Sequence, residues 1–135
     1  MTQVGVCTLP PIGEDMKSAA NKLVRQANEI IEQAVQQCGD RYTLIPVFDR
    51  MESILEKEGN RRDYAGTAGL LGWVMSLMYN LLPGAVKWNT LGSLVGHRLL
   101  HDGIHLNERG GAELVSLIVE WLVKKGVAKA IAVKS

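Results

Sequence analysis

Two short apolar segments flank one long amphipathic segment, and this order constrains the fold more than any other feature. Gln3–Leu9 and Tyr42–Phe48 are short, apolar and in part β-branched, which is typical of buried strands. Between them, apolar residues recur at helical spacing from Ser18 to about Gln37, and they predict one apolar, inward face that includes Leu23, Val24 and Ile30. A strand, a helix and a strand in this order form a βαβ unit, so the sequence predicts two parallel strands joined by a right-handed crossover.

The residues around these segments predict where each element ends. Pro10 and Pro11 end the first strand, and Gly13–Asp15 leads into the long helix with acidic residues near its positive end. Pro46 cannot donate to a sheet ladder, which places the second strand at or near an edge. The next segment, from Asp49 to about Lys57, is expected to form a short helix. Its expected buried side consists of Met51, Ile54 and Leu55.

A histidine- and glycine-rich segment near the C-terminus, residues 101–111, leads directly into an amphipathic helix. Asp102 and His105 stand three residues apart around Gly103, which suits a loop. Asn107 is a good helix N-cap. After it, apolar residues recur at helical spacing: Leu114, Leu117, Ile118, Trp121 and Leu122. A carboxylate and an imidazole on a loop pinned by a capped helix suit an acid/base pair, although a cap or a solvated side chain is the common alternative.

The string Asp-x-x-His-Leu-Asn-x-x-Gly at 102–110, followed by an apolar helix, resembles the last signature block of the SGNH (GDSL-type) esterases and lipases. Residues 4–13 are similar to the late core strand and proline turn of that family. The resemblance implies a Ser-His-Asp triad in which His105 is the general base and Asp102 its orienting carboxylate. It also implies a three-layer α/β/α sandwich on a flavodoxin-like parallel sheet, an ester or lipid-like substrate and no cofactor.

The chain departs from the family pattern at the nucleophile. The Gly-Asp-Ser-Leu block is absent, and so are the separate Gly and the Gly-x-Asn-Asp block that supply oxyanion donors. Ser93, in Leu-Gly-Ser-Leu, lacks the Asp and any strand before it. The expectation is a single domain over 1–135, the C-terminal part of the fold without its N-terminal strands. Such a chain would be inactive without a companion chain that carries the N-terminal half.

Residues 64–86 form an uncharged stretch with no counterpart in the family pattern. Its strongly apolar part, 70–82, is short for a membrane span because Pro83 and Gly84 interrupt the window. Three interpretations remain open: a buried helix, a lid or lipid-facing element beside the site, and a span. The second permits membrane-surface contact. It also gives the alternative function, a non-catalytic module that binds lipid or protein through this stretch.

His97, His101 and His105 stand four residues apart and would share one face of a continuous helix, a spacing that can bind zinc. Gly103 and the expected loop break that register, and no glutamate follows in a zincin pattern. The sequence therefore predicts no metal site. His97 and His101 are expected at the surface or against a partner.

Composition and charge narrow the class of protein to which the chain can belong. Hydrophobic residues make up 47% of the chain and charged residues 21%, the balance of a globular protein. A net charge of +1 and the lack of a basic run interleaved with aromatics argue against nucleic-acid binding. Cys7 and Cys38 are expected to be free, buried thiols. The first dozen residues lack the pattern of a secretion signal, and the sequence indicates no compartment.

Overall fold

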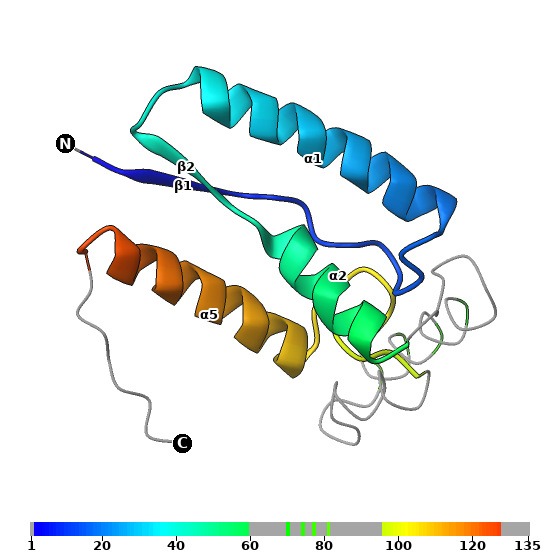
Figure 1. The fold of residues 1–135 in the computed structure, drawn as a ribbon. Coiled ribbons are helices and arrows are strands. Elements are labelled where there is room, and N and C mark those ends of the chain that lie inside the picture. The colour runs from blue at the N-terminus through cyan, green and yellow to red at the C-terminus, as the bar shows by residue number, and fades with distance from the viewer. Residues whose placement is uncertain are drawn as a thin grey trace.

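The computed structural model describes residues 2–59, 70, 74, 77, 81 and 96–127. Their regular elements, in chain order, are β1 (Val4–Cys7), α1 (Ala19–Gln37), β2 (Tyr42–Ile45), α2 (Val47–Lys57) and α5 (Glu108–Lys124). In Figure 1 the two strands run between α1 above and α5 below. The described part of the chain is thus a mixed α/β structure with a small sheet and three helices.

The two strands are parallel, as the sequence predicts. Val4 pairs with Tyr42, and the register continues to Cys7 and Ile45. Gly5 lies where α5 packs against β1, since a Cβ at this position would stand 2.8 Å from Ile45 Cδ1 and 3.1 Å from Trp121 Cε2. The absence of a side chain therefore lets the indole of α5 approach the strand.

Helix α2 begins earlier than predicted. The expected strand Tyr42–Phe48 ends at Ile45, and Val47 and Phe48 form the first turn of α2. Pro46 ends the strand because it has no N–H, and the buried hydroxyl of Thr8 accepts the N–H of Phe48 at 2.9 Å. Because the first helical N–H groups have no partner within the helix, this bond stabilises the early start.

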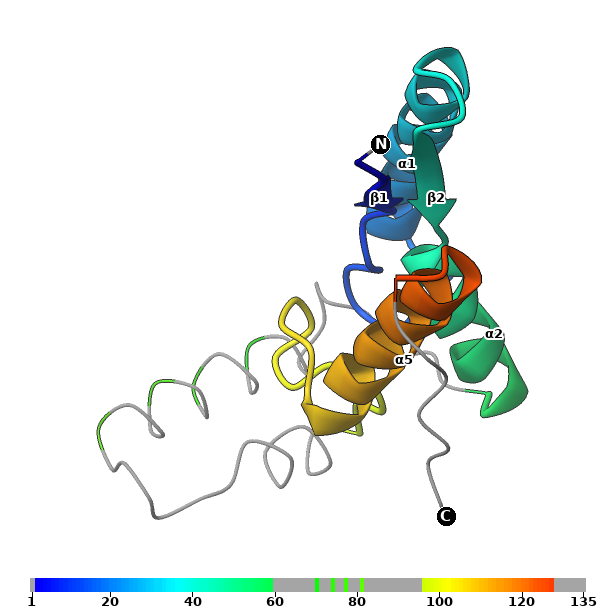
Figure 2. The ribbon, with the colours of Figure 1, turned by 90° about the vertical axis from the view of Figure 1, so that its left-hand side faces the viewer.

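Helix α2 contributes much of the hydrophobic core. Met51 and Leu55 are fully buried, as predicted, whereas Ile54 is only partly buried. The core cluster consists of Met16, Val24, Ile45, Val47, Phe48, Met51, Leu55, Leu99 and Leu117. Figure 2 shows α2 and α5 side by side, and Leu117 carries α5 into the same cluster. Burial of these side chains is the main force that holds α5, and with it the loop before α5.

Helix α1 matches its predicted bounds but only part of its predicted buried face. Ser18 caps it, accepting the N–H of Asn21 at 3.2 Å. Its buried residues are Asn21, Val24 and Asn28, whereas Leu23 and Ile30 are exposed although the pattern placed them inside. The reason is that the two asparagines bind the backbone of the 8–15 loop, which turns that polar stripe inward.

The two cysteines match the sequence prediction in one respect and differ from it in another. Cys7 and Cys38 are unpaired, as predicted, but both are exposed rather than buried. Burial of part of its surface still raises the pKa of the Cys7 thiol.

Within the described residues, no helix is both long and apolar enough to cross a membrane. Most of the 64–86 stretch lies outside the described residues, so its three interpretations stay predictions.

Candidate active site

Asp102 and His105 lie on a short loop that the backbone closes at both ends. Leu100 and Leu106 form an antiparallel bridge, and the N–H of His101 donates to the carbonyl of His105 at 3.0 Å. Gly103 turns the chain between them with a φ of 92°, a value that favours glycine. The loop that the sequence predicts is therefore present, and the flanking residues hold its shape.

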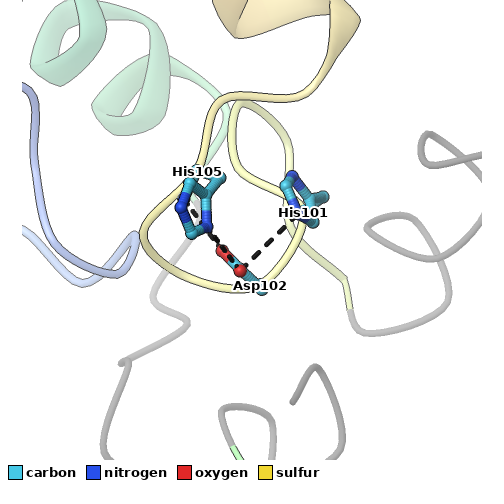
Figure 3. Close-up of side chains that lie close together, drawn as sticks. All are labelled: His101, Asp102 and His105. Atoms are coloured by element: carbon cyan, nitrogen blue, oxygen red, sulfur yellow. Dashed lines mark hydrogen bonds and ion pairs between the residues drawn. The ribbon is translucent and has the colours of Figure 1, made fainter. Parts of the chain in front are cut away.

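The carboxylate of Asp102 uses each oxygen for a different purpose. Oδ1 accepts the backbone N–H groups of Ile104 at 3.0 Å and His105 at 2.8 Å. Oδ2 lies 2.7 Å from Nδ1 of His105 (Figure 3). Burial alone would raise the pKa of Asp102, but these hydrogen bonds outweigh it and lower the pKa. Asp102 is therefore ionised at neutral pH, and its orientation is fixed before any ligand arrives.

His105 is oriented at one ring nitrogen, and most of its side chain is exposed. An ionised carboxylate only accepts hydrogen bonds, so Nδ1 of His105 carries the proton that bonds to Asp102. The lone pair of the neutral ring then lies on Nε2. The side chain is 70% exposed, whereas that of Asp102 is only 15% exposed. This is the arrangement of a general base held by a buried carboxylate. The structure thus brings the two predicted site residues together.

His101 joins the pair, which the sequence did not indicate. Its Nε2 lies 3.5 Å from Oδ2 of Asp102, and its ring stacks on that of His105 with centroids 5.5 Å apart (Figure 3). The side chain is only 12% exposed. Burial lowers the pKa of His101, and the charge of Asp102 offsets this only in part. Of the two expectations for His101, the surface position is therefore wrong, and contact with a partner stays a prediction.

His97 is also buried, with only 3% of its surface exposed, so the first of its two expected positions, at the surface or against a partner, is wrong. Neither of its ring nitrogens has a hydrogen-bond partner in the described structure. It does not join the cluster formed by His101, Asp102 and His105.

Asn107 caps α5, as predicted, and also ties the loop to the segment before it. Its Oδ1 accepts the N–H of Gly110 at 2.9 Å. Its Nδ2 donates to the carbonyls of Arg98 at 3.0 Å and Leu100 at 3.2 Å. One side chain therefore fixes both the start of the helix and the strand-like segment that precedes Asp102.

A buried glutamate that sequence reasoning treated as a helix-start residue supports the same segment. The carboxylate of Glu14 is fully buried and accepts the N–H groups of Arg98 at 2.7 Å, Leu99 at 2.6 Å and Leu100 at 2.9 Å. The neighbouring N–H of Gly13 donates to the carbonyl of Gly103 at 2.6 Å. The 8–15 loop thus holds the site loop at two places. Glu14 binds the segment that leads into it, and Gly13 binds its turn at Gly103.

The 8–15 loop is in turn attached to α1 by two buried amides. Asn28 accepts the N–H of Leu9 at 2.7 Å and donates to its carbonyl at 3.1 Å. Asn21 makes the same pair of bonds with Ile12, at 2.9 and 3.0 Å, and also donates to the carbonyl of Asp15. A continuous series of hydrogen bonds therefore runs from α1 through the proline turn and Glu14 to the site.

Adjacent glycines in the first turn of α5 provide a matched test of this packing. A Cβ at Gly110 would lie 2.2 Å from the carbonyl oxygen of Leu99, whereas one at Gly111 would meet nothing within 4 Å. Gly110→Ala is expected to lower the free energy of unfolding by about 2 kcal/mol, because backbone must move. Gly111→Ala should be neutral or stabilising by up to about 1 kcal/mol. Urea unfolding of both variants measures these changes in the free energy of unfolding. Equal effects would contradict the close approach.

The described structure does not place a nucleophile beside His105. Of the described serines, Ser18 caps α1 and Ser116 donates to Glu120, and none is hydrogen-bonded to the His105 ring. Ser53 lines a cavity of about 470 Å³ between β2, α2 and α5, but neither Asp102 nor His105 lines it. Ser93 lies outside the described residues. The arrangement can accept and return a proton, and within the described residues no serine lies beside it to act as the nucleophile.

No family model, no curated protein and no solved structure matches this chain. The resemblance to the SGNH hydrolases, and the three-layer sandwich that it implies, therefore stay predictions from the sequence.

Proposed function

We propose that the chain supplies the general base and the orienting carboxylate of an SGNH-type serine hydrolase that acts on carboxylic esters. The observation that carries the proposal is the 2.7 Å contact between Asp102 Oδ2 and His105 Nδ1, on a loop that is fixed independently of any ligand. Such a preorganised pair is what a serine hydroxyl needs, because the hydroxyl is a poor nucleophile until a neighbouring imidazole takes its proton.

In the proposed reaction, Nε2 of His105 removes the hydroxyl proton as the serine oxygen bonds to the ester carbonyl carbon. Asp102 stabilises the resulting imidazolium through Nδ1. The imidazolium then donates its proton to the leaving alcohol oxygen as the C–O bond breaks, which leaves an acyl-serine. Water, activated by the same ring, displaces the serine and releases the carboxylic acid. No cofactor takes part in any of these steps.

The serine and the oxyanion donors are proposed to come from a companion polypeptide. The sequence contains neither a Gly-Asp-Ser-Leu block nor a Gly-x-Ser-x-Gly turn. A sheet with only two described strands has pairing positions for more, and apolar side chains stand exposed on both helices that flank it, namely Leu23 and Ile30 on α1 and Val115 and Val119 on α5. Strands from a companion would extend this sheet and complete a three-layer α/β/α sandwich.

Labelling with a fluorophosphonate probe tests this proposal. The chain is isolated with any polypeptide that copurifies, and the labelled residue is located by mass spectrometry. A label on a companion serine, lost in His105→Ala but kept in Ile104→Ala, is the expected result. Ile104 is an exposed neighbour in the same loop, so it controls for loop disturbance. A label on a serine of this chain would remove the need for a companion. No label on either polypeptide would contradict the proposed function.

A second function, a non-catalytic module that binds lipid or protein, has one observation in its favour. Four apolar residues of the 64–86 stretch are helical, exposed and spaced to share one helix face: Leu70, Val74, Leu77 and Leu81. This function requires no companion and no reactive serine. Vesicle binding by a chain that takes no fluorophosphonate label would favour it over the hydrolase.

A further inference from the structure

We propose that His101, Asp102 and His105 form a zinc-binding site, in which the ion takes the place of the proton between His105 and Asp102. Each residue offers one ligand atom, and these atoms all lie within 4.8 Å of one another. The sequence argued against a metal because Gly103 breaks a helical register. The closed loop brings the two histidines together without a helix, since it places residues 101 and 105 opposite each other.

The spacing of the ligand atoms is close to what zinc requires. Zn²⁺ bound tetrahedrally at about 2.0–2.1 Å keeps its ligand atoms roughly 3.3 Å apart. Asp102 Oδ2 already lies 2.7 Å from Nδ1 of His105 and 3.5 Å from Nε2 of His101. The third pair, the two histidine nitrogens, lies within 4.8 Å, so side-chain shifts on the order of 1 Å bring the three atoms to the spacing that zinc requires.

The residues are also held in a way that limits the ordering cost of binding. Asp102 Oδ1 is occupied by two backbone N–H groups, so Oδ2 is aimed between the two rings. His101 and Asp102 are mostly buried, and the His101 ring stacks on His105. The two backbone N–H groups lie outside the metal shell, and partners of this kind orient the ligands of protein zinc sites.

The donor set selects the kind of ion. Two imidazole nitrogens and one carboxylate oxygen suit zinc and its first-row neighbours, whereas calcium and magnesium prefer oxygen ligands alone. Because the side chain of His105 is 70% exposed, the fourth position is open to water or to another ligand. Three protein ligands with an open fourth position are typical of accessible zinc sites.

Zinc binding at this site excludes the action of His105 as a base, and this consequence rests on the proposed function. A neutral imidazole has one lone pair. When zinc takes it at Nδ1, the ring proton moves to Nε2, and no proton is gained or lost overall. His105 then has no lone pair at Nε2 for a serine proton, and Asp102 no longer orients it. The site would therefore bind zinc or catalyse ester hydrolysis, but not both at once.

The test is calorimetric titration of the purified chain with ZnCl₂ after chelator treatment, with Co²⁺ absorption to report the coordination geometry. One zinc per chain is expected, and His101→Ala and His105→Ala should each weaken it at least about 100-fold. Ile104→Ala should bind as the unchanged chain does. Circular dichroism verifies that each variant is folded, and if His101→Ala is not, the exposed His105 decides the outcome.

Zinc binding and the loss of base function at His105 are measured in separate experiments. Absence of zinc binding, or binding of equal strength in His105→Ala, would overturn the proposal. Zinc binding without any fluorophosphonate labelling would support the metal site while contradicting the hydrolase. If both are present, zinc should suppress labelling in the unchanged chain, and labelling unaffected by bound zinc would contradict the exclusion of the base by the metal.

Discussion

Replacing Asp102 with asparagine is expected to slow ester hydrolysis about 10⁴-fold in the hydrolase that contains this chain. The substitution keeps the shape of the side chain but offers His105 an amide in place of the carboxylate that lies 2.7 Å from Nδ1. The ring then loses both the acceptor that fixes its tautomer and the charge that stabilises the imidazolium. Initial rates with a short-chain nitrophenyl ester, at saturating substrate, measure this change in turnover.

Asp40→Asn is the matched control, because Asp40 is an exposed carboxylate in the turn after α1 and should leave the rate unchanged. Affinity for the substrate should change little in Asp102→Asn, since the carboxylate acts on the base and not on the ester. A rate within about threefold of the unchanged protein would show that Asp102 is a loop residue and not the orienting carboxylate.

The Glu14→Gln substitution is expected to have the largest effect on stability, lowering the free energy of unfolding by about 3 kcal/mol. The buried carboxylate accepts three successive N–H groups, those of residues 98–100. An amide has one acceptor oxygen instead of two, and its NH₂ group would face backbone donors. Because small domains are stable by only about 5–15 kcal/mol, a loss of this size is a large share of the total. Urea unfolding at neutral pH measures it.

Glu29→Gln serves as the control, since Glu29 is exposed on α1 and should change stability by less than about 0.5 kcal/mol. The two substitutions are chemically identical and differ only in burial and partners. An equally small effect for Glu14→Gln would mean that the carboxylate does not hold residues 98–100, and the support of the site loop would need another explanation.

Most of the fold in the described residues could be predicted because local patterns determine it. The period of apolar residues predicts α1 and α5, Asn107 marks the start of α5, and the strand–helix–strand order predicts the parallel pair. The Asp102–His105 contact could be predicted because both residues lie in one short segment. Local sequence was enough for these features because the residues that determine each of them are near in the chain.

Most of the interactions that the sequence did not indicate depend on how the chain closes on itself, and two of them join distant segments. Glu14 binds residues 98–100, and Thr8 binds Phe48 to start α2 early, although neither pair is adjacent in the sequence. His101 meets Asp102 because the loop closes through backbone bonds, which side-chain spacing does not reveal. The inward polar stripe of α1 was missed for the same reason, since the partners of its asparagines are loop backbone. One signal was available: Asn21 and Asn28 stand seven apart, two helical turns.

The tautomer of His105 most directly tests the claim that Asp102 orients His105 as a general base. Its measurement needs neither a companion chain nor a substrate. A long-range ¹H–¹⁵N correlation spectrum of the chelator-treated chain distinguishes a protonated ring nitrogen from an unprotonated one. If Asp102 orients a general base, neutral His105 carries its proton on Nδ1 and leaves Nε2 free, and Asp102→Asn abolishes this preference. A proton found on Nε2 of neutral His105 in the unchanged chain would contradict the account, because that nitrogen could not accept a proton from a serine.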